Sequence, residues 1–133
     1  MFRAKKSLGQ NFLINRGVLD KIINAAELDK NDTVIEIGPG TGVLTEKLAE
    51  KADKIIAIEK DRRLIEGLKE KFKNTNVEIV EADVLKLDIG ELFRNYKLEI
   101  RNSNYKVVGN IPYYITSHLL KTIFEELRRK ETS

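Results

Sequence analysis

The chain has 133 residues, of which 41% are hydrophobic and 34% charged, so it can form one domain or part of one and lacks the composition of a disordered protein. Its 24 Lys and Arg residues barely exceed its 21 Asp and Glu residues, and the formal net charge of +3 is weak evidence for a polyanionic partner. The absence of cysteine and the single histidine exclude disulfides and thiolate metal sites, and we predict no metal centre. No segment has the apolar length that spans a bilayer, and we expect a cytoplasmic protein.

Residues 2–13 follow neither the helical nor the strand period. Three basic residues, Arg3, Lys5 and Lys6, precede a mixture of glycine, amides and aromatic and aliphatic side chains that ends at Leu13. Such a mixture is typical of a binding segment, and its basic residues are candidates for phosphate contacts. A frayed terminus pinned by its last two apolar residues explains the composition equally well.

From residue 15 onward, helical and strand patterns alternate. Apolar residues at helical spacing predict helices over about residues 15–26, 43–51, 61–72, 88–93 and 116–127. Apolar runs predict strands at residues 34–37, 54–58, 77–80 and 105–109, with a turn at 29–32 and a loop at 96–104. Asn15, Asp61 and Asp88 are positioned to cap three of the helices.

This alternation predicts a parallel sheet with right-handed crossovers, a Rossmann-like α/β fold. In the strand at 77–80 apolar and polar residues alternate, which predicts a position near the edge of the sheet. Ligands of such sheets bind beyond the carboxyl ends of the strands. The residues that follow the four strands are Gly38, Glu59, Asp83 and Asn110. We therefore expect these four residues to meet at a ligand site.

The first predicted strand runs directly into Gly38, Gly40 and Gly42, and a helix follows. Glycine can adopt positive φ and lets a ligand approach the backbone, while the helix start offers free N–H groups. The spacing G-x-G-x-G differs from the dinucleotide fingerprint G-x-G-x-x-G. Together with Glu36 it resembles the first motif of S-adenosylmethionine (SAM) methyltransferases. A plain connection between strand and helix is the alternative.

Three acidic residues near the strand ends have two interpretations each. Glu59 could accept hydrogen bonds from a ribose diol, or could simply favour the start of the next helix. Asp83 could accept a bond from an adenine amino group, with Val84 packing on the ring, or could be a turn residue. Glu36 could hold a cofactor's ammonium group through a water, or could brace the glycine turn, and we favour bracing.

The segment from Asn110 to Tyr113, Asn-Ile-Pro-Tyr, has the chemistry of an amine-methylating site. The exocyclic amine of a base is a poor nucleophile because its lone pair is delocalised into the ring. Acceptors on its hydrogens, the side-chain oxygen of Asn110 and the carbonyl of Ile111, would favour the pyramidal nitrogen that attacks a methyl group. Pro112 would fix the backbone, and Tyr113 could stack on the base. The alternative is a turn with an aromatic plug.

Five motifs occur in order along the chain: Lys-Lys-Ser-Leu-Gly-Gln-Asn-Phe-Leu (5–13), Glu-Ile-Gly-Pro-Gly-Thr-Gly (36–42), Ile-Glu-Lys-Asp (58–61), Glu-Ala-Asp-Val-Leu (81–85) and Gly-Asn-Ile-Pro-Tyr (109–113). Together they resemble the ribosomal RNA adenine N6,N6-dimethyltransferase family. With a glycine before Gln-Asn-Phe-Leu, the first motif resembles that of the small-subunit branch of the family. The erythromycin-resistance methylases, which modify large-subunit RNA, share the motifs and are the alternative.

The resemblance implies SAM as the cofactor, covered by the Gln-Asn-Phe-Leu segment, with the glycine turn at its methionine end and acidic residues at its ribose and adenine. Carried over to this chain, the cofactor-binding residues are Gln10, Asn11, Phe12, Leu13, Gly38, Gly40, Glu59, Asp83, Val84 and Asn110. The catalytic residues are Asn110, Ile111, Pro112 and Tyr113, and the RNA-binding candidates are Arg3, Lys5 and Lys6.

The same resemblance implies a class I methyltransferase that dimethylates the N6 amines of adjacent adenosines in small-subunit ribosomal RNA, in ribosome biogenesis. A non-catalytic ribosome-assembly factor that binds SAM is a further alternative. A nicotinamide dehydrogenase is disfavoured by the glycine spacing and by Asn-Ile-Pro-Tyr.

The sequence departs from the family pattern in two ways. Tyr114 stands where the family often has asparagine, which affects the expected pocket wall. Family members also continue through three more strands into a helical C-terminal domain that engages RNA. We therefore expect residues 1–133 to be the N-terminal part of the SAM-binding domain, with a sheet that is incomplete after the fourth strand and no C-terminal helical domain. We expect a monomer at full length, unless another chain supplies the remainder.

Overall fold

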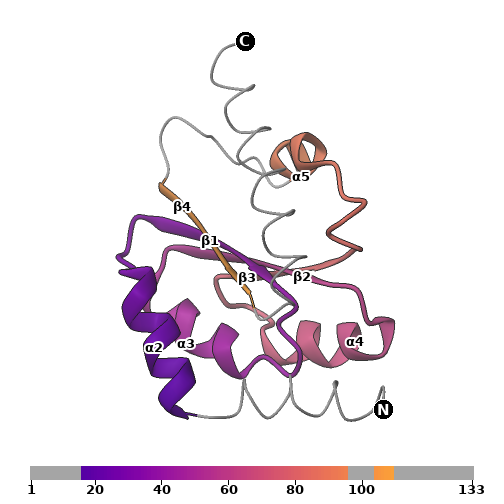
Figure 1. The fold of residues 1–133 in the computed structure, drawn as a ribbon. Helices are drawn as coiled ribbons and strands as arrows, with labels where there is room; N and C mark the ends of the chain where they lie inside the picture. Colours follow the sequence, from indigo (N-terminus) through magenta and orange to yellow (C-terminus); the bar gives the residue numbers. More distant parts are fainter. Residues whose placement is uncertain (1–15, 96–103, 110–133) are drawn as a thin grey trace.

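Four parallel strands form one sheet in the order β3-β2-β1-β4 in the computed structural model, which describes residues 16–95 and 104–109 (Figure 1). The strands are β1 (Asp32–Ile37), β2 (Lys54–Glu59), β3 (Val77–Glu81) and β4 (Asn104–Gly109). The register places Ile37 beside both Ile58 and Gly109, so the carboxyl ends of the central strands share one edge. The predicted parallel sheet is confirmed, and β3 lies at the end of the order, as its alternating pattern predicts.

Two strands begin earlier than the sequence patterns predict. β1 starts at Asp32, in the expected turn, and pairs there with Asn104, in the expected loop. The Asp32 carboxylate is only 1% exposed and pairs with the ammonium of Lys106 at 3.0 Å. The same ammonium donates to the carbonyl oxygen of Glu27 at 2.6 Å. The first residues of these two strands are polar, so an apolar pattern could not predict them. Their contacts hold together the end of the sheet opposite the candidate site.

Helices cover both faces of the sheet (Figure 1). On one face lie α2 (Arg16–Ala26), α3 (Val43–Lys51) and α4 (Arg62–Lys71), and on the other lies α5 (Ile89–Asn95). Asp61 caps α4 by accepting from the backbone N–H of Arg63 at 3.0 Å, and Asp88 accepts from that of Glu91 at 3.1 Å. Both predicted caps are confirmed. The predicted cap Asn15 and the predicted helix at 116–127 lie outside the described residues.

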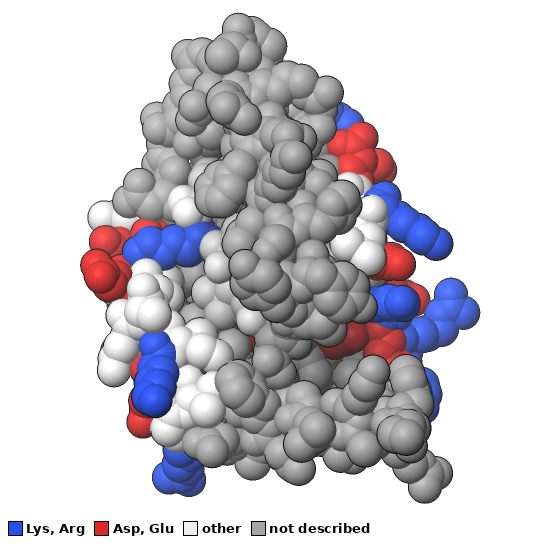
Figure 2. Space-filling view, viewed as in Figure 1, with Lys and Arg blue, Asp and Glu red and all other residues white. Residues whose placement is uncertain are grey.

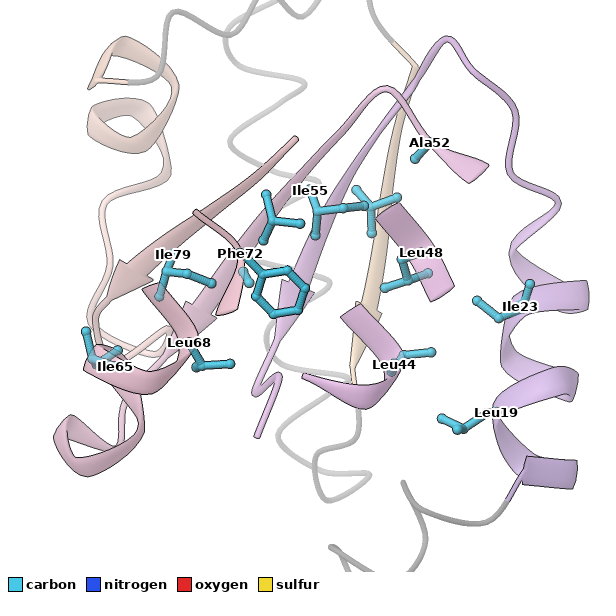
Figure 3. Packing of buried hydrophobic residues seen from close by; sticks show 13 residues of the cluster. Leu19, Ile23, Leu44, Leu48, Ala52, Ile55, Ile65, Leu68, Phe72 and Ile79 are labelled. Atoms are coloured by element: carbon cyan, nitrogen blue, oxygen red, sulfur yellow. The ribbon is translucent and has the colours of Figure 1, made fainter. Parts of the chain in front are cut away.

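The hydrophobic core has two clusters because alternate side chains of β1 and β2 point to opposite faces of the sheet. The larger cluster packs the sheet against α2, α3 and α4 (Figure 3), where Leu19, Leu44 and Leu68 come from the three helices. The second contains Ile35, Ile37, Ile56 and Ile58 and is covered by Leu92 of α5. Among the helices within residues 16–95, none combines the length and the hydropathy that a membrane span requires.

Candidate ligand site at the carboxyl edge of the sheet

The glycine turn leaves β1 with a left-handed backbone. Gly38 has a φ of 71° and Gly42 a φ of 89°, a region that side-chain-bearing residues rarely adopt. The N–H of Gly38 still donates to the carbonyl oxygen of Ile58 at 2.9 Å, so the turn begins while the chain is paired with β2. Apart from the two chain neighbours of Gly38, no atom of the described residues would lie within 4 Å of a Cβ built on it. The described part of the chain therefore leaves room for a ligand to approach this backbone closely.

The other end of the turn is packed against the end of α4. A Cβ on Gly42 would lie 2.8 Å from the ring of Phe72, which belongs to the larger core cluster (Figure 3). The ammonium of Lys71 donates to the carbonyl oxygen of Thr41 at 3.2 Å and pairs with Glu46 of α3 at 3.1 Å. Lys71, the last residue of α4, and Phe72, its C-cap, thus hold the glycine turn in place from the helical layer.

Alanine substitutions at the two glycines should have unequal effects on stability. Gly42→Ala should lower the free energy of unfolding by about 2 kcal/mol, because the strained φ adds to the collision with Phe72. Gly38→Ala should lower it by only about 1 kcal/mol, because it has the strained φ alone. Urea unfolding of both variants measures the difference. A Gly38→Ala variant less stable than Gly42→Ala would contradict this view of the turn.

Glu59, the last residue of β2, lies beneath the turn with 7% exposure. Its Oε1 accepts from the N–H of Gly40 at 3.1 Å, and its Oε2 accepts from the N–H of Asp61 at 2.8 Å. The carboxylate thus joins the glycine turn to the start of α4, as the helix-start interpretation predicts. Each carboxylate oxygen has a second lone pair, so acceptor capacity remains for the hydroxyl groups of a ligand.

Asp83 follows β3 at the same edge of the sheet. The N–H of Ala82 donates to the carbonyl oxygen of Glu59 at 3.0 Å, which continues the pairing of β3 with β2 up to this point. The Oδ1 of Asp83 accepts from the N–H of Leu85 at 3.0 Å, so the carboxylate also stabilises a turn. Val84 is half-buried and packs against the second core cluster.

Glu36 is a buried carboxyl group two residues before the turn, with 1% exposure. The hydroxyl of Thr45, in α3, donates to its Oε1 at 2.5 Å. Burial raises the pKa of Glu36 from 4.5 to about 7; the Thr45 hydrogen bond opposes this rise and the negative charge of Glu59 adds to it. The contact ties β1 to the helix behind the turn, in line with the bracing interpretation.

β4 ends beside the glycine turn. A Cβ on Gly109 would lie 3.1 Å from the carbonyl oxygen of Ile37, so the two backbones approach closely at the edge of the sheet. Gly38, Glu59, Asp83 and the end of β4 thus meet at one edge, as the strand pattern predicts. The predicted site residues outside the described part are Gln10, Asn11, Phe12, Leu13, Asn110, Ile111, Pro112 and Tyr113, together with Arg3, Lys5 and Lys6.

Charges of both signs are interspersed on the face drawn in Figure 2. Among the described residues, two exposed arginines pair with nearby acids: Arg62 with Glu81 at 3.1 Å and Arg63 with Asp61 at 2.9 Å. Within residues 16–95 and 104–109, no group of three or more histidine, aspartate or glutamate side chains could hold a metal ion.

The sequence patterns did not identify three residues of the site, which are Thr45, Lys71 and Phe72. Lys71, the last residue of α4, contacts the glycine turn through the carbonyl oxygen of Thr41. Thr45 and Phe72 lie on apolar helix faces, where periodicity predicts burial but not the partner. Nothing in the spacing from Glu36 to Thr45 signals their hydrogen bond, because packing of α3 on the sheet creates it.

Comparison with known proteins identifies the family. The whole chain, residues 1–133, matches the model of the ribosomal RNA adenine dimethylase family. It is 47% identical over 131 residues to ribosomal RNA small subunit methyltransferase A of Dehalococcoides mccartyi, covering 98% of this chain and 43% of that protein. The enzyme of the same name from Alkaliphilus oremlandii is 44% identical over 126 residues, which are 94% of this chain and 43% of the relative. The chain thus spans less than half the length of these curated relatives.

Solved structures of two transferases share the fold of this chain. A dimethyladenosine transferase from Plasmodium falciparum is similar with a TM-score of 0.65 and 36% identity, over 84% of this chain and 37% of that one. The 23S rRNA methyltransferase ErmE is similar with a TM-score of 0.64 and 35% identity, over 80% of this chain and 40% of that one. The expected Rossmann-like methyltransferase fold is confirmed. The chain belongs to the ribosomal RNA adenine dimethylase family.

Proposed function

We propose that this chain is the N-terminal part of a SAM-dependent methyltransferase that dimethylates adenine N6 in small-subunit ribosomal RNA. The observation that carries the proposal is the meeting of the open glycine turn with Glu59 and Asp83 at one edge of the sheet. The membership of the family and the small-subunit names of the similar relatives support the substrate.

The residues at this edge fit SAM. The open backbone at Gly38 suits close approach by the methionine end, which a Cβ would obstruct. The free lone pairs of Glu59 can accept from a ribose diol, and the carboxylate of Asp83 can accept from an adenine amino group. SAM, when bound, supplies an electrophilic methyl group on a positively charged sulfur.

The target amine would be held by the segment that follows β4, because β4 ends at Gly109, beside Ile37 and the start of the glycine turn. The side-chain oxygen of Asn110 and the carbonyl of Ile111 would accept the two amine hydrogens, which leaves the nitrogen lone pair free to attack. Pro112 would fix the angle between these acceptors, and Tyr113 would stack on the extruded base.

The remaining parts of the proposal concern RNA and the cell. Arg3, Lys5 and Lys6 would contact RNA phosphates near the cleft, which is consistent with their place before the Gln-Asn-Phe-Leu segment. The full-length protein would act as a monomer on the small ribosomal subunit in the cytoplasm. Gln10, Asn11, Phe12 and Leu13 would cover the cofactor.

Glu59→Gln should weaken SAM binding by about 10–100-fold, because it removes a charge-assisted bond of about 1.5–3 kcal/mol to the ribose. Calorimetric titration of the full-length protein with SAM measures this loss. Glu81→Gln is the matched control, because Glu81 lies beside Glu59 in the register but is exposed and paired with Arg62. Unchanged affinity in a folded Glu59→Gln variant would remove Glu59 from the site.

Transfer of labelled methyl groups from SAM to isolated ribosomal subunits tests the function itself. We expect labelling of small-subunit RNA at adenine N6 by the full-length protein. Labelling of large-subunit RNA alone would favour the second candidate, for which the structural similarity to a 23S rRNA methyltransferase is the specific support. SAM binding without labelling of either RNA would favour a non-catalytic assembly factor.

A further inference from the structure

The hydrogen bond between Thr45 and Glu36 lies in the interior, directly behind the glycine turn. Thr45 is 0% exposed and Glu36 is 1% exposed, so water screens neither group. The hydroxyl oxygen of Thr45 lies 2.5 Å from the Oε1 of Glu36, a distance typical of a strong bond to a carboxylate. α3 begins at Val43, so Thr45 belongs to the first turn of the helix that follows the glycines.

No cation balances Glu36 among the described residues. In the register it lies between Ala57 of β2 and Val108 of β4, which are both apolar. The charged group that acts on it is the acid Glu59, at the end of β2. The lysine of β4, Lys106, is paired with Asp32 at the opposite end of the sheet from the glycine turn. In the described part of the chain, the Thr45 hydroxyl is therefore the group that favours the charged form of Glu36.

We propose that Thr45 is a positioning residue of the cofactor site, whose hydroxyl holds Glu36 and keeps its carboxyl group available in the negatively charged form. The proposal rests on SAM being the ligand of the glycine turn. SAM carries a positively charged sulfur, a positively charged ammonium and a negatively charged carboxylate, so it is a net cation. A negative Glu36 below the turn favours such a ligand, whereas a protonated Glu36 does not.

The proposal predicts that cofactor binding and proton release from Glu36 are linked. As the pH falls through the range in which Glu36 takes up its proton, near the value of about 7, SAM affinity should fall with it. Removing the Thr45 hydroxyl moves this range to higher pH, because the charged form loses its hydrogen bond. The variant Thr45→Val keeps the branched shape of the side chain, and Thr45→Ser keeps the hydroxyl.

The first measurement needs no cofactor. The carboxyl carbon resonance of Glu36, followed by NMR against pH in the full-length protein, gives the midpoint of its ionisation. We expect a higher midpoint in Thr45→Val than in the wild type, and a return towards the wild-type midpoint in Thr45→Ser. An unchanged midpoint in Thr45→Val would overturn the proposal and leave Thr45 as a packing residue.

The second measurement is SAM affinity by calorimetry at several pH values between about 6 and 7.5, a range in which the cofactor's α-amino group stays largely protonated. At the lower pH, Thr45→Val should bind SAM about tenfold more weakly than the wild type, the loss expected for one bond to a charged group. The difference in SAM affinity between the wild type and Thr45→Val should become smaller as the pH rises. Thr45→Ser should restore SAM affinity towards the wild-type value.

The ratio of the SAM affinities of the wild type and Thr45→Val could stay constant with pH although the ionisation midpoint of Glu36 is shifted. That result would overturn the link between Glu36 and the cofactor. Absence of SAM binding in all three proteins, the wild type included, would overturn the proposed cofactor and this proposal with it. The NMR result would still report whether Thr45 controls the ionisation of Glu36, so the two failures are distinguishable.

Discussion

Asn110→Ala is expected to slow methyl transfer by about 10²–10³-fold, the cost of losing one contact that strengthens as charge develops in the transition state. Asn110 follows Gly109, whose strand pairs with β1 just before the glycine turn. An acceptor at this position would accept a hydrogen bond from the target amine, and this bond would strengthen as the nitrogen becomes positively charged. SAM affinity should fall far less, because the other proposed cofactor contacts come from residues 10–13 and from the carboxyl ends of β1, β2 and β3.

Single-turnover methylation by the full-length protein at saturating SAM measures this effect separately from binding. Tyr113 provides the matched comparison: Tyr113→Ala should lose about 1–3 kcal/mol of base stacking, whereas Tyr113→Phe keeps the ring face and should keep most activity. Near-normal turnover of Asn110→Ala, or a phenylalanine variant as impaired as the alanine variant, would make this segment a structural turn.

Folding stability should fall as the pH rises through neutrality, because of Glu36. The pKa of its buried carboxyl is about 7 in the folded chain and 4.5 as its ordinary value, so the folded state binds the extra proton between these limits. The stabilisation is complete below about pH 4.5 and is lost as the pH rises through about 7. The difference corresponds to about 3 kcal/mol of unfolding free energy.

Glu36→Gln should remove this pH dependence, because a neutral amide has the size of the protonated carboxyl group and does not ionise. Urea unfolding of the cofactor-free protein from about pH 5 to about pH 9 gives the difference between wild type and variant, in which all other titrations cancel. The control is Glu50→Gln, at an exposed carboxylate of α3. Equal pH slopes for the wild type and Glu36→Gln would show that Glu36 ionises as an exposed group does.

Much of this fold could be predicted from the sequence because its signals are local. A helix cap such as Asp61 acts on N–H groups two residues away, and the apolar runs at 54–58 and 77–80 are long enough to define strands. Parallel topology then brings the ends of successive strands to one edge without any knowledge of side-chain contacts. For that reason the meeting of Gly38, Glu59 and Asp83 was predictable from their positions after strands alone.

Tertiary structure decided which partners these residues have. Glu59 accepts a hydrogen bond from Gly40, and Glu36 accepts one from Thr45, because the parallel pairing of β1 with β2 and the packing of α3 on the sheet bring these residues together. The ring of Phe72 beneath Gly42 has the same origin. Periodicity reports which face of an element is buried, whereas the crossing of helix over sheet determines which atoms meet there. The charge state of Glu36 follows from that packing, since it depends on the exclusion of water around the carboxyl group and on the hydroxyl of Thr45 beside it.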